Sequence, residues 1–73
     1  FIVKHYDKPG VLAFVMDILK TGNINIEEVE NVIFDGGIVA SCTMKLESSA
    51  TAEMLETIRN NPDIISYSHV ELN

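Results

Sequence analysis

The residues best suited to bind a small polar molecule lie in one short segment, residues 5–11. His5 and Asp7 stand at the end of a predicted strand, and Pro9-Gly10 opens the helix that follows. The N-terminus of a helix carries free N–H groups and about half a positive charge, so it favours an anion such as a carboxylate. Asp7 suits an ammonium group and His5 suits a hydroxyl group. The segment therefore predicts a site for a molecule with one anionic and one cationic end.

A third polar side chain, Asn25, comes where the chain returns from the predicted helix into the next strand. Its amide donates and accepts hydrogen bonds, so it fits the same kind of ligand. Each of the three residues also has a purely structural interpretation. Asp7 suits a helix cap, His5 a half-exposed strand position, and Asn25 a turn. Residue types and spacing alone leave both interpretations open.

The other polar residues predict no catalytic centre. Glu28 and Glu30 share one face of a predicted strand, which suits a solvated strand better than an acid–base pair. Cys42 falls on the inward face of its strand and is predicted to be a small core residue. Neither histidine, His69 included, has a partner at metal-ligand spacing, and Gly36-Gly37 lacks the lysine of a phosphate loop. We therefore expect no catalysis, no metal and no cofactor in this chain.

Composition narrows the classes of partner. The chain has 73 residues, which is room for one domain, and its net charge is −6. Nucleic acids and anionic membranes attract lysine and arginine, so neither is expected as a partner. Cys42 is the single cysteine, which fits a reducing cytoplasm, and no apolar run approaches the about 20 residues of a membrane span. The sequence opens at Phe1 inside a predicted strand, so we expect residues 1–73 to be a domain of a longer enzyme.

Hydrophobic periodicity predicts four strands and two helices. The clearest pattern is the alternation in residues 38–47, which predicts a strand with one buried face. Its inward set is Ile38, Ala40, Cys42, Met44 and Leu46. Gly22 fits the end of the first helix, Asp35-Gly36-Gly37 a hairpin turn, and Ser48-Ser49 the N-cap of the second helix. The predicted strands span residues 1–6, 24–34, 38–47 and 64–72, and the predicted helices span residues 11–21 and 50–60.

This order of elements predicts an α+β domain with a βαββαβ, ferredoxin-like fold. Crossover connections are right-handed, so both helices fall on one face of a four-stranded sheet. We predict a mixed sheet, in which the helical crossovers join parallel neighbours and the hairpin joins an antiparallel pair. The residues predicted for the other sheet face are Val39, Ser41, Thr43, Tyr67 and His69.

Two motifs resemble a known family. His5-x-Asp7-Lys8-Pro9-Gly10-Val11-Leu12, followed by Gly22-Asn23-Ile24-Asn25-Ile26, is similar to the signature of ACT domains. Residues 30–36 and 61–66 are also similar to that group, so the resemblance covers essentially the whole chain. The closest likeness is to the C-terminal regulatory domain of D-3-phosphoglycerate dehydrogenases. The fold of that family has the same βαββαβ order that the periodicity predicts.

The resemblance implies a regulatory domain that pairs with a second copy and binds L-serine at the interface, as a feedback inhibitor. By motif position, His5, Asp7 and Asn25 would contact the ligand, and Gly10 would lie close to it. Position 7 is commonly Asn in the serine-inhibited enzymes, whereas here it is Asp, whose carboxylate can receive the ligand ammonium. NAD would belong to the catalytic part of a parent phosphoglycerate dehydrogenase.

Two other hypotheses stay open at this point. One is a structural ACT-type dimerisation module without an effector, and the other is an ACT domain that senses a different amino acid. Two ferredoxin-like classes are not expected. A metal carrier needs paired thiols, and an RNA-recognition domain needs exposed aromatic residues on its central strands, of which residues 38–47 contain none.

Overall fold

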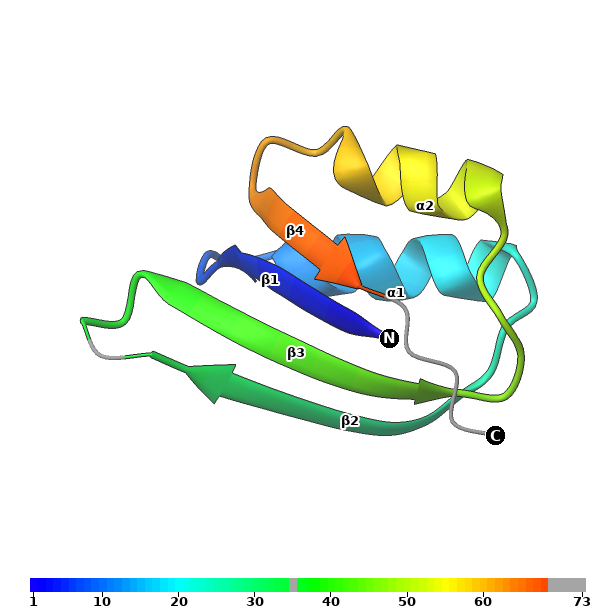
Figure 1. The fold of residues 1–73 in the computed structure, drawn as a ribbon, viewed down its shortest axis with the longest axis horizontal. Helices are drawn as coiled ribbons and strands as arrows, with labels where there is room; N and C mark the ends of the chain where they lie inside the picture. Colours follow the sequence, from blue (N-terminus) through cyan, green and yellow to red (C-terminus); the bar gives the residue numbers. More distant parts are fainter. Residues whose placement is uncertain (35, 69–73) are drawn as a thin grey trace.

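In the computed structural model, which describes residues 1–34 and 36–68, all six predicted elements are present (Figure 1). In chain order they are β1 (Ile2–Tyr6), α1 (Val11–Thr21), β2 (Ile26–Ile33), β3 (Val39–Leu46), α2 (Ala52–Arg59) and β4 (Ile64–Ser68). The predicted extension of the last strand to residue 72 falls outside the described residues, as do Asp35 and His69. The element order confirms the predicted α+β, ferredoxin-like fold.

The four strands form one sheet in the order β2-β3-β1-β4, and every neighbouring pair is antiparallel. The predicted mixed sheet with parallel neighbours is therefore wrong. Both helical crossovers do join strands of the same direction, β1 with β2 and β3 with β4. However, β3 lies between β1 and β2, and β1 lies between β3 and β4. A helical crossover fixes the direction of the strand that follows it. It does not determine whether a third strand lies between the two strands that it joins.

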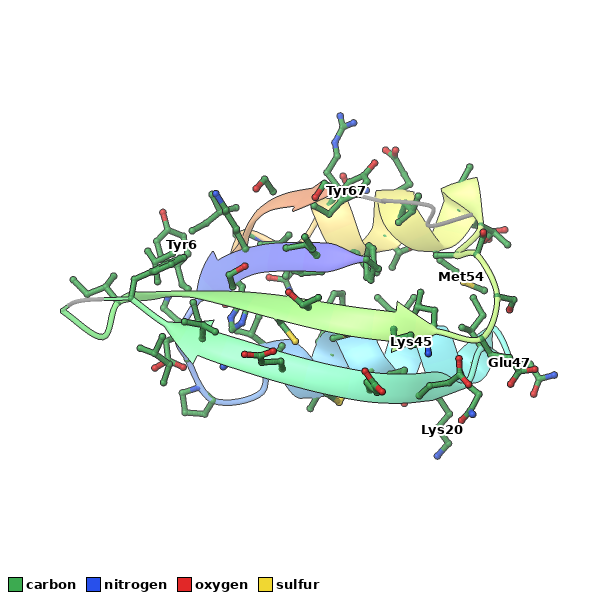
Figure 2. All side chains as sticks on the ribbon, turned by 60° about the horizontal axis from the view of Figure 1, so that its bottom comes forward. Tyr6, Lys20, Lys45, Glu47, Met54 and Tyr67 are labelled. Carbon is green, nitrogen blue, oxygen red and sulfur yellow. The ribbon has the colours of Figure 1, made fainter. Side chains whose placement is uncertain are left out.

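Both helices cover the same face of the sheet, as predicted (Figures 1 and 2). The alternation predicted for β3 is confirmed, because Ala40, Cys42 and Met44 are all buried. Ile38 is the exception: it precedes β3 and is 67% exposed, so its predicted inward place is wrong. The core cluster consists of Phe1, Val3, Val11, Val15, Leu19, Ile24, Cys42, Met44, Ile58 and Ile64.

The helix ends follow local hydrogen bonding. α1 ends at Gly22, as predicted, and the Gly22 N–H donates to the Ile18 carbonyl at 3.0 Å. α2 has Thr51 as its N-cap, where the Thr51 hydroxyl accepts from the backbone N–H of Met54 at 3.2 Å. The predicted cap at Ser48-Ser49 is therefore wrong. A capping side chain must stand two or three residues before the N–H that it binds, and Thr51 has this spacing to Met54.

Tyr67 lies on the helix-covered face, so its predicted place on the open face is wrong. It pairs across the sheet with buried Val3, and its ring stands 6.5 Å from that of Phe1. The register between β1 and β4 shifts at Ile65, which has no partner in β1. Simple alternation from buried Ile64 would send Tyr67 outward. The extra residue of a bulge reverses the phase, and Tyr67 turns inward.

Cys42 is a fully buried residue of the core, as predicted. It lies on β3 between Ala40 and Met44, all on the face that the helices cover. Removal from water disfavours the charged thiolate, and burial therefore raises the pKa of the Cys42 thiol. The residue acts as a small apolar side chain that stays protonated.

We expect the free energy of unfolding to fall as the pH rises above about 8.5, where an unfolded thiol loses its proton. Because the pKa of Cys42 is raised in the folded chain, the folded state keeps a proton that the unfolded state releases. The loss is at most about 1.4 kcal/mol per pH unit up to the folded-state pKa. Urea denaturation at several pH values measures the slope, and Cys42→Ala must make it shallower. Equal slopes in the two chains contradict the prediction.

Candidate functional site

Helix α1 separates the predicted site residues into two groups (Figure 1). His5 lies near the end of β1, and Asp7 and Gly10 lie in the loop before α1, whereas Asn25 follows the opposite end of the helix. α1 has 11 residues, which corresponds to a length of about 16 Å. Within one chain, the structure therefore does not bring Asn25 together with the other three.

His5 is a buried residue with both ring nitrogens engaged, not a half-exposed one. Only 1% of its surface is exposed. Its Nδ1 lies 2.9 Å from the Tyr6 carbonyl oxygen, and its Nε2 lies 3.1 Å from Oδ1 of Asn31 on β2. Its neighbour on β3 is Ala40, and the short Ala40 side chain leaves space for the imidazole to reach the edge strand. A ligand can bond this imidazole only by displacing one of its present partners.

The hydrogen bond to the Tyr6 carbonyl determines which nitrogen of the His5 ring carries a proton. A carbonyl oxygen only accepts, so Nδ1–H is the donor to Tyr6. If the ring is neutral, Nε2 is an acceptor and the Asn31 amide must turn its NH2 group toward it. If Asn31 Oδ1 faces the ring, Nε2 is the donor and Oδ1 the acceptor. In either orientation of the Asn31 amide, the amide atom that does not face the ring remains on the exposed side of β2.

Asp7 and Gly10 leave the start of α1 open. The N-cap is Gly10, with a left-handed φ of 86°, and no side chain caps the helix. The predicted capping role of Asp7 is therefore wrong. Asp7 is exposed, and its carboxylate makes no hydrogen bond within the described residues, while its backbone N–H donates to the Ile38 carbonyl at 2.8 Å. Glycine is needed at position 10 for its backbone angle, which other residues rarely adopt. The loop before α1 thus carries an exposed carboxylate, and no side chain caps the first N–H groups of the helix.

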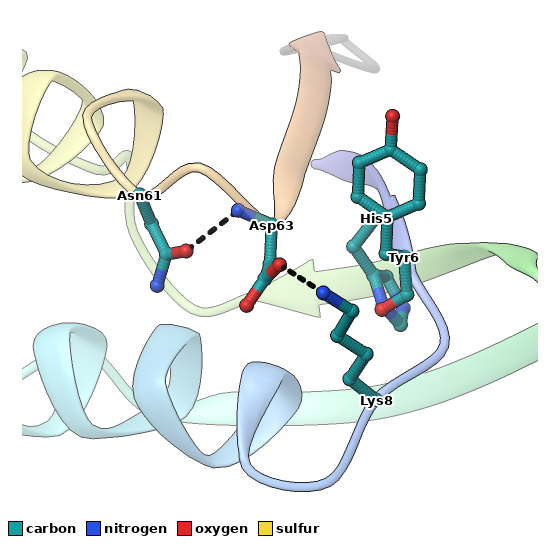
Figure 3. A network of polar contacts seen from close by, with 5 residues as sticks. All are labelled: His5, Tyr6, Lys8, Asn61 and Asp63. Atoms are coloured by element: carbon teal, nitrogen blue, oxygen red, sulfur yellow. Dashed lines mark hydrogen bonds and ion pairs between the residues drawn. The ribbon is translucent and has the colours of Figure 1, made fainter.

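A second contact network holds this loop in place (Figure 3). The Lys8 ammonium lies 3.1 Å from the Asp63 carboxylate, and the backbone N–H of Asp63 donates to the Asn61 side chain at 2.8 Å. The Asp63 carbonyl in turn accepts from the Tyr6 N–H at 2.9 Å. An exposed ion pair contributes at most about 1 kcal/mol, so its effect is mainly to position the segment before α1. Sequence inspection missed this role because 55 residues separate Lys8 from Asp63.

Asn25 lies at a cavity at the other end of α1. The cavity has a volume of about 540 Å³. Its apolar walls are Met16, Ile24 and Ile26, and its polar residues are Lys20, Asn23, Asn25 and Glu47. The Glu47 N–H donates to the Asn25 carbonyl at 2.9 Å, which ties the end of β3 to the loop that follows α1. The structure therefore surrounds Asn25 with both a cationic and an anionic side chain.

Strand β2 is an edge strand with an uncovered apolar side. Val29 pairs with Met44 and Ile33 with Ala40, so both belong to the face that the helices cover elsewhere. They are nevertheless 45% and 54% exposed. On the opposite face Glu28 pairs with Lys45, and Glu30 lies on the same face, as predicted. An unpaired strand edge with apolar side chains is suited to pairing with another strand.

The described residues contain neither a metal-binding cluster nor a membrane-spanning helix. In residues 1–34 and 36–68, no three His, Cys, Asp or Glu side chains lie close enough together to hold a metal ion. No helix in these two segments has both the length and the apolarity to cross a bilayer.

Among known proteins, neither a family model nor a curated sequence matches the chain. The function is therefore inferred from the residues and the geometry above, together with the motif resemblance.

Proposed function

We propose that this chain is a regulatory domain of the ACT type that binds an amino acid, with L-serine as the first effector to test. The observation that carries the proposal is the open start of α1. Its uncapped N–H groups suit a carboxylate, and the unbonded carboxylate of Asp7 in the preceding loop suits an ammonium group. An amino acid has both groups on one carbon atom. In this proposal the chain itself is not an enzyme and needs no cofactor.

The complete site requires a second copy of the chain. If two β2 edges pair antiparallel about a two-fold axis, the two α1 helices also run antiparallel. The start of one α1 then faces the end of the other, so Asp7 of one copy approaches Asn25 of the second copy. Exposed Val29 and Ile33 would be covered by this pairing. Such a homodimer extends the sheet across both copies and reunites the residues that α1 separates.

The regulatory mechanism follows from that geometry. A ligand held between two copies stabilises the pairing in which its contacts are complete, and it shifts the equilibrium only by its differential affinity for the two arrangements. Catalytic domains linked to the two copies would respond to the change. The proposed parent is an NAD-dependent phosphoglycerate dehydrogenase of the cytoplasm, where the reducing environment keeps Cys42 a thiol.

A structural dimerisation module is the second candidate function. The observation in its favour is His5, because the protein itself satisfies both ring nitrogens. A residue predicted to contact the ligand then has a sufficient structural role without any ligand. This alternative predicts dimers that bind no amino acid.

A complementation experiment tests the first proposal. We expect the wild-type dimer to bind L-serine in calorimetric titration, with glycine and L-phenylalanine as comparison ligands and the oligomeric state measured by sedimentation. Asp7→Ala and Asn25→Ala should each abolish binding. A mixture of the two variants should regain about a quarter of the wild-type sites, because half of its dimers are mixed and each of these keeps one intact site.

The matched control is Asp17→Ala, which removes an exposed carboxylate from α1 away from both groups of site residues. It should leave binding unchanged. If the mixture binds no better than its components, the site is not shared between copies. A wild-type dimer that binds no amino acid supports the structural module instead.

A further inference from the structure

Two charged residues outside the motif also line the cavity around Asn25. Lys20, in the last turn of α1, and Glu47, directly after β3, both line it (Figure 2). Both side chains are exposed, and neither forms an ion pair within the described residues, where Lys8–Asp63 is the pair present. One cationic and one anionic group are therefore available to a ligand at the same cavity.

Backbone hydrogen bonds fix the segments that carry these groups. Asn23 has a left-handed φ of 60°, and its N–H donates to the Lys20 carbonyl at 2.9 Å, which closes the turn after α1. Ile24 is buried, and its N–H donates to the Leu19 carbonyl at 2.9 Å. The bond from the Glu47 N–H to the Asn25 carbonyl adds the end of β3 to the same turn. The cavity is thus a folded feature, with Met16, Ile24 and Ile26 as its apolar walls.

Charge decides which ligand fits. A ligand with a single charge would meet one complementary side chain and one of its own sign. A zwitterion offers a carboxylate to Lys20 and an ammonium to Glu47, and each contact is a charge-assisted hydrogen bond. The end of α1 carries about half a negative charge, which also favours an ammonium group on this side. The amides of Asn23 and Asn25 make no side-chain hydrogen bond in residues 1–34 and 36–68, so they remain available to a polar substituent.

We infer that Lys20 and Glu47 determine the specificity of this domain for zwitterionic α-amino acids, with Glu47 accepting from the ligand ammonium and Lys20 donating to its carboxylate. The inference rests on the proposed function, because it takes an amino acid as the ligand. It adds two residues that no motif identifies, and it locates the discriminating contacts at the end of α1. In this inference Asn25, which lines the same cavity, contacts the same ligand.

The test compares variants against ligands that lack one charge. The full 73-residue chain is titrated with L-serine, with ethanolamine, which lacks the carboxylate, and with 3-hydroxypropanoate, which lacks the ammonium. We expect Glu47→Gln to weaken L-serine binding about tenfold or more. It should not weaken 3-hydroxypropanoate, whose carboxylate loses a neighbour of its own sign. Lys20→Gln should weaken L-serine binding similarly. It should not weaken ethanolamine, whose ammonium group loses a neighbour of its own sign. Glu56→Gln and Lys4→Gln remove exposed charges elsewhere and serve as controls.

Each outcome is decisive. If the wild type binds L-serine and both variants bind it equally well, this inference is overturned while the proposed function stands. If the wild type binds no amino acid, both are overturned. As a second measurement, amide chemical shifts of the wild type with L-serine should change at residues 23–26 and at Glu47. Changes confined to residues 7–12 would show that the ligand sits only at the start of α1, which also overturns the inference.

Discussion

Replacing Ile58 by alanine should remove about 3 to 4 kcal/mol from the free energy of unfolding. Ile58 is fully buried and is the only residue of α2 that is. Its truncation removes apolar contacts between α2 and the core and leaves a cavity there. A domain of 73 residues has a total stability of about 4 to 11 kcal/mol, so the loss takes a large part of it. Urea denaturation followed by circular dichroism measures the change.

Ile38→Ala is the matched control for this experiment. It makes the same chemical change at a side chain that is 67% exposed, and the expected loss is within about 0.5 kcal/mol. The two variants differ in burial and not in residue type, so the difference between them reports the contribution of the core. A loss below about 1 kcal/mol for Ile58→Ala would mean that α2 is not packed against the sheet at this residue.

Local patterns were sufficient to predict the elements of this fold. The alternation of residues 40–46 identifies β3, because a half-buried strand imposes a period of two on the sequence. Gly22 and the apolar stripe before it identify α1 and its end, because helix termination depends on residues close in sequence. The order of elements then limits the fold to a helix-covered sheet. Each of these inferences depends on neighbours within a few residues.

Two features that were predicted wrongly depend on residues far apart in sequence. The sheet is antiparallel because β3 lies between β1 and β2, and β1 lies between β3 and β4. No short sequence pattern encodes this strand order. The inward position of Tyr67 depends on an unpaired residue, Ile65, whose effect is visible only against the register of β1. The cap of α2 is a local error, because Thr51 and Met54 are three residues apart. The sequence offers several neighbouring hydroxyls and does not show which of them reaches the free N–H group.

The candidate site shows the same division. Asp7, Gly10 and Asn25 were recognisable from a motif, because a loop before a helix and a turn after it have local signatures. The motif does not show that Asp7 and Asn25 lie at opposite ends of helix α1. Lys20 and Glu47 lie 27 residues apart in sequence and meet at one cavity only through the fold. Asn31 was missed for the same reason, since its contact with His5 spans 26 residues.

His5→Ala should lower the free energy of unfolding by about 2 to 4 kcal/mol. The change deletes a buried side chain, leaves a cavity, and removes the donor to the Tyr6 carbonyl at 2.9 Å. Asn31→Ala removes only the partner on exposed β2, and the expected loss is about 1 kcal/mol. Combining the two variants in a double-mutant cycle isolates their shared hydrogen bond, whose coupling should be about 0.5 to 1.5 kcal/mol. A loss within about 0.5 kcal/mol for His5→Ala would contradict a buried, bonded imidazole.

This result bears on how His5 variants should be interpreted in binding experiments. A His5→Ala chain that is partly unfolded binds less ligand whether or not the imidazole touches the ligand, because only the folded fraction is competent. Affinity must therefore be corrected for the folded fraction measured under the same conditions. If the corrected affinity equals that of the wild type, His5 acts by supporting β1 and β2. If it remains reduced while Asn31→Ala binds normally, the imidazole itself contacts the ligand, as the motif resemblance implies.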